Sequence, residues 1–415
     1  MRESNPYCSP VTDSVIPGPL AGMISHVVSI RIIVFLGVLV SAVAVICCYF
    51  ATSILHITLL LGGIFGIGMG LAYNLCPVLI NQYFLTKRAM ACGLFYAGST
   101  AGALIGPLVV RYLLDNQGVQ MMWVIMGGSL FIGMCGALVL TPSENYFKVK
   151  DEPKTPDEDL KMKELGISYI SKPDQVILPV VVLKTKPTFC ETVNSWCLYI
   201  KDIFSSMPYV LTTLAYIFFH NTYIMLTIIM PATAVDMGYP QSKENTLLCY
   251  ACLDLIGRLI PGMLSYYRFI SNINMFNVSL MVLGVSLFFM QIASNAYIML
   301  GLCGIFGFTG GVLLCLTPVL VAQYTEPDKT AIAFGLSNFF NGCVSIARPF
   351  LIEYSKISTG NYFLIFNLLG VANTVIALMW GGYRLYVRTK RTKSWSPDHS
   401  LDDVSYLSRA ASIVM

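Results

Sequence analysis

Residues 63–83, GIFGIGMGLAYNLCPVLINQY, return in altered form at residues 304–324 as GIFGFTGGVLLCLTPVLVAQY. The shared GIFG, PVL and QY fall in register without a gap. Two further matches keep the same order along the chain: GMIS at Gly22 with GMLS at Gly262, and AMACGL at Ala89 with AIAFGL at Ala331. Chance similarity between apolar segments is the competing explanation. Matches that recur in one order favour two repeats in the same orientation.

Composition indicates that these repeats lie in a membrane. Hydrophobic residues make up 56% of the 415 residues, charged residues only 12%, and the mean hydropathy is +0.69. A soluble chain carries about 25% charged residues. Neither the 13 cysteines nor the four histidines show the spacing of a metal site. We expect no metal, no cofactor and no nucleic-acid partner, and no nucleophile and base that would indicate an enzyme.

Apolar runs long enough to cross a bilayer, which takes about 20 helical residues, follow one another along the chain. The predicted spans are 32–51, 55–78, 89–113, 121–140, 209–235, 246–267, 276–292, 297–319, 331–352 and 363–386. When the two repeats are aligned, only the end of a second helix precedes the span 32–51. We therefore expect the first half to lack its first helix and most of its second. The predicted fold class is an all-α membrane protein with two parallel helical repeats, as in the major facilitator fold, and about 10 full transmembrane helices of roughly 12.

The repeats divide the chain into a helical half at 1–141, a charged central loop at 142–206, a second helical half at 207–387 and a basic tail at 388–415. Cytoplasmic loops carry an excess of Lys and Arg. With the central loop in the cytoplasm, most basic residues of the loops fall on that side: Arg31, Lys87, Arg88, Arg268, Lys329, Arg384, Arg388, Lys390, Arg391 and Lys393. The other side keeps Arg111, Lys243 and Lys356. We predict a multi-pass protein of the bilayer whose central loop and C-terminus are cytoplasmic.

Two charges sit in the middle of the apolar run 246–267, TLLCYACLDLIGRLIPGMLSYY. Asp254 and Arg258 are four residues apart, so they lie on one helix face and can meet. Each costs about 2.5–3.5 kcal/mol at the centre of a membrane helix. An internal ion pair would explain their spacing but not why a membrane helix carries charges. We favour a charged patch that faces a water-filled path.

The run 68–102, GMGLAYNLCPVLINQYFLTKRAMACGLFYAGSTAG, closely resembles the fourth and fifth helices of monocarboxylate transporters in the major facilitator superfamily. The shared features are an Asn and Pro helix end, a Tyr-Phe pair, a basic loop, a Gly-Leu pair and an Ala-Gly-Ser: here Asn74, Pro77, Tyr83, Phe84, Lys87, Arg88, Gly93, Leu94, Ala97, Gly98 and Ser99. DLIGRLIPG at 254–262 resembles the family's eighth helix. AIAFGL at 331–336 and TGNY at 359–362 resemble its eleventh helix and the residues that follow.

The resemblance implies a plasma-membrane carrier of small organic anions such as lactate or pyruvate, often with a proton, and an immunoglobulin-domain accessory glycoprotein as partner. In proton-coupled members the eighth-helix Asp carries the proton and the Arg anchors the carboxylate, which correspond to Asp254 and Arg258. The chemistry fits, because the planar guanidinium of an Arg matches a carboxylate. Substrate bound to Arg258 would then release Asp254 to be protonated.

Arg348 stands where the family's eleventh helix usually reads Gly-Pro-Pro. We predict that it pairs with Asp254 when the outer gate is closed; an Arg that reaches the outer headgroups is the alternative. Asn74 and His220 complete the predicted substrate and proton site, although a histidine that only joins helices would also explain His220. Lys87 and Arg88 form a cytoplasmic loop motif whose simplest role is to set topology.

Two other functions fit the same sequence. A related carrier of aromatic amino acids or other organic solutes would work without protons, and its uptake would not accelerate as the outside pH falls. A truncated form that does not transport would act as a regulatory or assembly partner. We favour alternating-access transport of monocarboxylates linked to protons.

Overall fold

The computed structural model describes residues 21–22, 24–25, 28–84, 87–139, 200–267, 269–293, 295–326 and 329–394. Within these ranges nine helical segments are long and apolar enough to cross a membrane. One of them, Arg88–Ala137, has 50 residues, more than twice the roughly 20 that cross a bilayer. Its helix is interrupted at Gly118, whose φ of 78° and ψ of 170° only glycine adopts readily. When this segment is counted as two crossings, the nine segments give ten crossings within the described ranges, as predicted. The described residues thus confirm the predicted all-α fold.

The first half contains α2 (Ile30–Cys47), which continues as η2 (Cys48–Phe50). The next span consists of α3 (Ile54–Ile57), the π-helical η3 (Thr58–Phe65) and α4 (Gly66–Tyr83). Helix α5 (Arg88–Val139) supplies the last two crossings. Helix α2 packs against both α4 and α5. These bounds lie within a few residues of the predicted ones, because the apolar run sets the length of a membrane helix.

The second half begins with α9 (Met207–Asp236), η4 (Pro240–Ser242) and α10 (Lys243–Tyr266). It continues with α11 (Asn272–Phe289), η5 (Met290–Ile292) and α12 (Ala296–Tyr324). The last helices are α13 (Thr330–Ser345), α14 (Arg348–Thr359) and α15 (Phe363–Ser394). Helix α12 packs against α9, α10 and α11, and α11 also packs against α15. The larger buried core of the described residues lies here, with Phe219, Phe306 and Trp380 fully enclosed.

One predicted span is interrupted. The run 331–352 forms not one helix but two, α13 and α14, with a turn at Ile346 and Ala347. Pro349 explains the break, because proline has no N–H to continue the helix but fits the first turn of a new one. Arg348 therefore becomes the first residue of α14.

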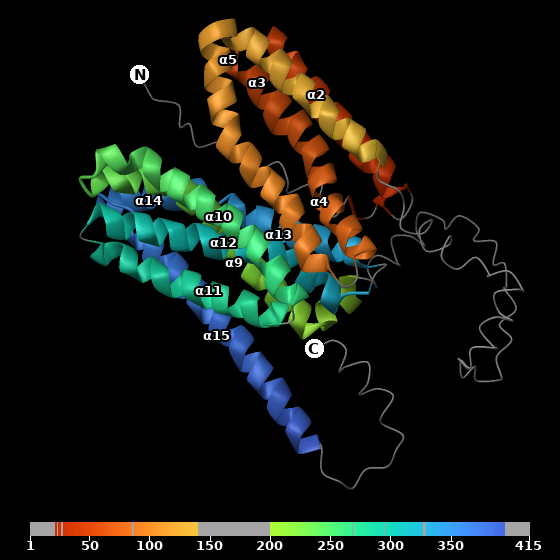
Figure 1. Ribbon diagram of the computed structural model, residues 1–415, viewed down its shortest axis with the longest axis vertical. Coiled ribbons are helices and arrows are strands. Elements are labelled where there is room, and N and C mark those ends of the chain that lie inside the picture. The colour runs from red at the N-terminus through yellow and green to blue at the C-terminus, as the bar shows by residue number, and fades with distance from the viewer. Residues whose placement is uncertain are drawn as a thin grey trace, which may run out of the picture.

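Figure 1 shows α2, α3, α4 and α5 as one group of helices and α9 to α15 as a second group. The groups meet where α4 and α5 reach α10, α12 and α13. The central loop and the tail were predicted at 142–206 and 388–415, and most of both lies outside the described residues. The domain boundaries therefore stay predictions, and so does the expected lack of a first helix.

Candidate functional site

The charged pair of α10 lies at the contact between the two halves. Asp254 Oδ2 and Arg258 Nη2 are 2.8 Å apart, and these residues are only 1% and 4% exposed. The two side chains meet, as their i, i+4 spacing allows; that they face a water-filled path stays a prediction. Arg258 also donates from Nη1 to the carbonyl oxygen of Tyr96 at 2.6 Å and to Ser99 Oγ at 2.7 Å, both on α5. From Nη2 it donates to the hydroxyl of Tyr223 on α9 at 3.0 Å.

Asp254 is bound to the first half as well. Thr100 Oγ1 on α5 donates to Asp254 Oδ2 at 2.7 Å. Hydroxyl side chains of membrane helices commonly bond across to a neighbouring helix in this way. Asp254 Oδ1 and Arg258 Nε, by contrast, are buried without a hydrogen-bond partner among the described residues. The pair thus joins the two halves and keeps one acceptor and one donor unused.

Glycines allow α5 and α10 to approach closely enough for these bonds. A Cβ on Gly93 would lie 2.3 Å from the carbonyl oxygen of Arg258, and a Cβ on Gly262 would lie 2.5 Å from Cα of Met90. Past Thr100 the helices separate. A Cβ on Gly102 would meet no atom within 4 Å, and Ile105 is 59% exposed. Figure 1 shows α5 leaving the second half in this direction.

Asn74 forms a second contact between the halves. It is buried on α4, where its Nδ2 donates to the carbonyl oxygen of Gly70 at 2.7 Å. Its Oδ1 accepts from Asn338 Nδ2 on α13, and Asn338 Oδ1 accepts from the hydroxyl of Tyr216 on α9 at 2.5 Å. The adjacent Tyr73 connects this contact with the charged pair, because its ring lies 5.9 Å from that of Tyr96.

Arg348 forms no ion pair with Asp254, whose partner is Arg258. It is 6% exposed, and its Nε and Nη2 atoms are buried without a hydrogen-bond partner in the described part of the chain. It lies between Asn341, which bonds to His220 of α9, and Leu351, which shares a pocket with Met225 of α9. The guanidinium is therefore enclosed by helices and does not reach the headgroups. Asp254 is occupied by Arg258 in this conformation, so a pairing with Arg348 in another conformation stays a prediction.

The loop motif links three helices. Arg88 Nε donates to the carbonyl oxygen of Asn81 at 3.2 Å, which ties the start of α5 to the end of α4. Lys87 Nζ lies 4.8 Å from the ring centre of Tyr266, at the end of α10 in the second half. Such a cation–π contact contributes about 0.5–1 kcal/mol at an exposed site. The motif marks the end at which the halves touch.

Several residues of the site were not predicted from the sequence: Thr100, Tyr216, Tyr223, Asn338 and Asn341, the last of which bonds to His220. The two asparagines could have been identified from the sequence, because amides three residues apart in an apolar helix usually bond to another helix. Nothing in the sequence distinguished Thr100 and the tyrosines, since hydroxyl side chains are common in membrane helices. In the described ranges no group of His, Cys, Asp and Glu is arranged to hold a metal.

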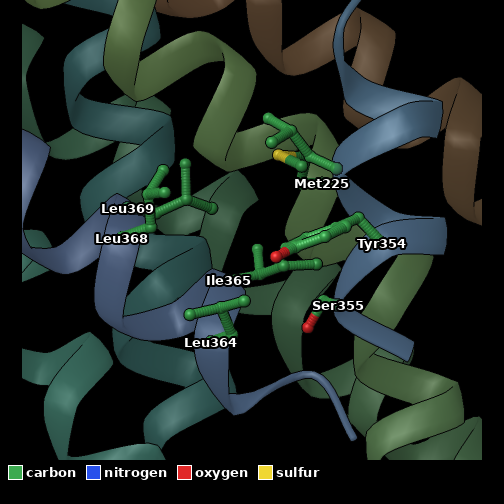
Figure 2. A pocket seen from close by; sticks show the side chains of 8 residues that line it. Met225, Tyr354, Ser355, Leu364, Ile365, Leu368 and Leu369 are labelled. Atoms are coloured by element: carbon green, nitrogen blue, oxygen red, sulfur yellow. The ribbon is translucent and has the colours of Figure 1, made fainter. Parts of the chain in front are cut away.

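A separate apolar pocket lies between α9, α14 and α15. Figure 2 shows Met225, Tyr354 and Leu368 among the side chains around it. The hydroxyl of Ser355, which also lines it, donates to the carbonyl oxygen of Asn361 at 3.0 Å. The pocket contains no charged side chain, so it offers nothing to bind an anion.

Comparison with known proteins identifies the superfamily to which this fold belongs. The model of the major facilitator superfamily matches residues 14–349. The chain belongs to this superfamily. Two solved superfamily structures share the fold at 13% identity. The proton:xylose symporter XylE has a TM-score of 0.63, covering 90% of this chain and 84% of its own. The Escherichia coli fucose:proton symporter FucP has a TM-score of 0.60, covering 89% and 88%.

Relatives within the superfamily confirm the resemblance seen in the sequence. Human monocarboxylate transporter 12 is 23% identical over 382 residues, which cover 90% of this chain and 71% of that protein. Monocarboxylate transporter 9 of Gallus gallus is 24% identical and human monocarboxylate transporter 14 is 22% identical. They cover 81% and 86% of this chain, and 75% and 78% of their own length. The chain is thus a multi-pass membrane transporter of the superfamily and not an enzyme.

Proposed function

We propose that this transporter carries small monocarboxylates such as lactate or pyruvate, together with a proton, by rocking of its two halves. The observation that supports this most is the buried ion pair of Asp254 and Arg258, which is bonded to the opposite half. Buried charges in membrane helices mark substrate and proton pathways. The names of the relatives favour a monocarboxylate as the substrate.

Substrate and proton act on the same pair. A carboxylate that reaches Arg258 competes with Asp254 for the guanidinium, so it weakens the 2.8 Å ion pair. Asp254 then loses its counter-charge and takes a proton from water in the path. The neutral carboxyl group and the neutralised Arg258 no longer hold α5 as ions, which lets the halves part. Release of the carboxylate on the other side restores the ion pair and expels the proton.

The end at which the halves touch carries Lys87 and Arg88, and Lys329 lies just before α13. Lys329 forms ion pairs with Asp202 and Glu326, and these hydrogen bonds raise the pKa of its ammonium group above the usual range. It therefore stays charged at neutral pH. The positive-inside rule places this end in the cytoplasm. The present conformation is then open towards the outside of the plasma membrane.

Aromatic amino acids are the second candidate substrates. The rings of Tyr223 and Tyr250 lie 5.5 Å apart next to the charged pair, and they suit an aromatic or cationic group. The unused Asp254 Oδ1 could accept from an ammonium group. Such a carrier would not need a proton.

Uptake of labelled lactate, pyruvate and phenylalanine into cells tests both candidates, at outside pH values of about 6 and about 7.5. We expect carboxylate uptake to rise at the lower pH and to vanish in Arg258→Ala. Phenylalanine uptake that does not depend on pH would support the second candidate. Surface-expressed protein without uptake of any of the three would refute carboxylate transport and favour a regulatory or assembly role. Co-expression of an immunoglobulin-domain glycoprotein distinguishes that result from failure to reach the surface.

A further inference from the structure

Arg348 is a buried cation with no counter-charge among the described residues. It forms no ion pair there, and Glu353, a carboxylate on the same helix, is exposed and does not bond to it. Two of its nitrogen atoms, Nε and Nη2, are buried without a partner. Burying an unpaired charge is costly, so such groups are normally matched by a carboxylate or by a ligand.

His220 lies along the part of α9 that packs beside Arg348, because it bonds to Asn341, seven residues before Arg348, and Met225 shares a pocket with Leu351, three residues after it. Asn221 Nδ2 donates to the carbonyl oxygen of Ile217 at 2.7 Å and to Asn341 Oδ1 at 3.0 Å. The bond to a backbone carbonyl fixes which end of the Asn221 amide donates. Asn341 must therefore turn its Nδ2 towards His220 Nδ1, 3.1 Å away, which acts as acceptor. The proton of a neutral His220 then sits on Nε2, which is a donor.

The break between α13 and α14 adds to the positive potential. Arg348 is the first residue of α14, a helix of 12 residues. The N-terminal end of a helix carries partial positive charge, and interrupted membrane helices in transporters direct such ends at anionic substrate groups. The same turn of chain thus combines a helix N-terminus with a buried guanidinium that lacks a partner.

We propose that Arg348 and the Nε2–H of His220 bind the carboxylate of the transported solute before Arg258 does. Arg258 already has four bonds in this conformation, to Asp254, Tyr96, Ser99 and Tyr223. Arg348 has two buried nitrogen atoms without a partner among the described residues, Nε and Nη2, whereas Arg258 has one, Nε. This inference rests on the proposed function and assigns its first binding step to α14. The carboxylate moves on to Arg258 as the halves close.

Equilibrium binding to the purified full chain in lipid nanodiscs tests the assignment, with labelled pyruvate, lactate and phenylalanine as probes. Arg348→Gln removes the charge and keeps polar atoms. Arg348→Lys keeps the charge but loses the planar guanidinium, which can donate two parallel hydrogen bonds to a carboxylate. Lys356→Gln is the matched control, because Lys356 lies on the same helix and pairs with Asp236 at the edge. We expect Kd to rise roughly 10- to 100-fold in Arg348→Gln, less in Arg348→Lys, and to stay unchanged in the control. Lactamide, the uncharged amide of lactate, should not compete.

The outcomes separate the two proposals. Unchanged Kd and KM in both Arg348 variants, with uptake intact in the wild type, would overturn the role of Arg348 and leave carboxylate transport standing. A wild type that neither binds nor takes up any probe at about 10 mM, above the usual KM range, would overturn both. If Arg348→Gln fails to fold, Arg348→Lys still decides, because loss of two-point binding alone should raise Kd.

Discussion

Removing both members of the buried ion pair should destabilise the protein less than the two single removals added together. At 2.8 Å the attraction between Asp254 and Arg258 is about 6 kcal/mol for an effective dielectric constant of about 20. Breaking one partner of a buried pair costs about 3–5 kcal/mol, because the other charge stays buried. Arg258 keeps bonds to Tyr96, Ser99 and Tyr223. We therefore expect about 3 kcal/mol for Asp254→Asn, at the lower end of that range.

Thermal unfolding of the purified protein in nanodiscs measures this loss. For a chain of this length the entropy of unfolding converts 1 kcal/mol into about 1 °C, so Asp254→Asn should lower Tm by about 3 °C. Arg258→Gln should lower it by a similar amount. The double variant should lose at least about 2 °C less than the two single losses together, because no uncompensated charge remains.

An exposed ion pair provides the control. Asp236 and Lys356 are 2.6 Å apart, but their side chains are 30% and 41% exposed. Such pairs contribute about 0–1 kcal/mol, so Asp236→Asn should leave Tm within about 1 °C of the wild type. Additive losses in the double variant of the buried pair would refute the reasoning, because they would show that Asp254 and Arg258 do not compensate each other.

Further expectations concern the contacts between the halves. Gly93→Val should abolish transport and lower Tm, because its side chain would collide with the carbonyl of Arg258, whereas Gly102→Val on the same helix should be tolerated. Asn338→Leu removes the bonds to Asn74 and Tyr216 and should change the uptake rate at least about threefold; an unchanged rate would show that this contact does not hold the halves. The raised pKa of Lys329 predicts that its stabilising ion pairs are fully formed below about pH 10 and lost only as pH rises through the raised pKa. Melting curves of the wild type and Lys329→Gln should therefore differ by the same amount at about pH 6 and about pH 9.

The sequence predicted the helices well because the membrane constrains them strongly. Each span needs about 20 apolar residues and must satisfy its own backbone hydrogen bonds, so apolar runs give positions and lengths directly. The helix of Asp254 and Arg258 was predicted, and so was the possibility that they meet, since i, i+4 spacing depends only on local geometry. The break before Arg348 was missed, although Pro349 could have suggested it.

The contacts between the halves could not be predicted from the sequence. Thr100 and Asp254 are separated by 154 positions, and Asn74 and Asn338 by 264. Nothing in a single helix shows which of its faces meets another half. The resemblance to monocarboxylate transporters identified Asn74, Asp254 and Arg258 and included Ser99, but it did not show which residues of α5 and α13 they meet. Whether Arg348 finds a partner also depends on how the helices pack, so the sequence could not predict it.

The uneven neutralisation of charges inside the helix bundle has an electrical consequence. Asp254 and Arg258 cancel each other, whereas Arg348 has no carboxylate partner in the portion of the chain described. A charge that moves across the whole membrane potential gains or loses about 2.3 kcal/mol per 100 mV. A monocarboxylate and a proton that bind together add no net charge, so the loaded and the empty carrier would both carry the one positive charge of Arg348. The membrane potential would then act on the two crossings in opposite directions and cancel over a cycle, and the proton gradient would set how steeply the solute accumulates.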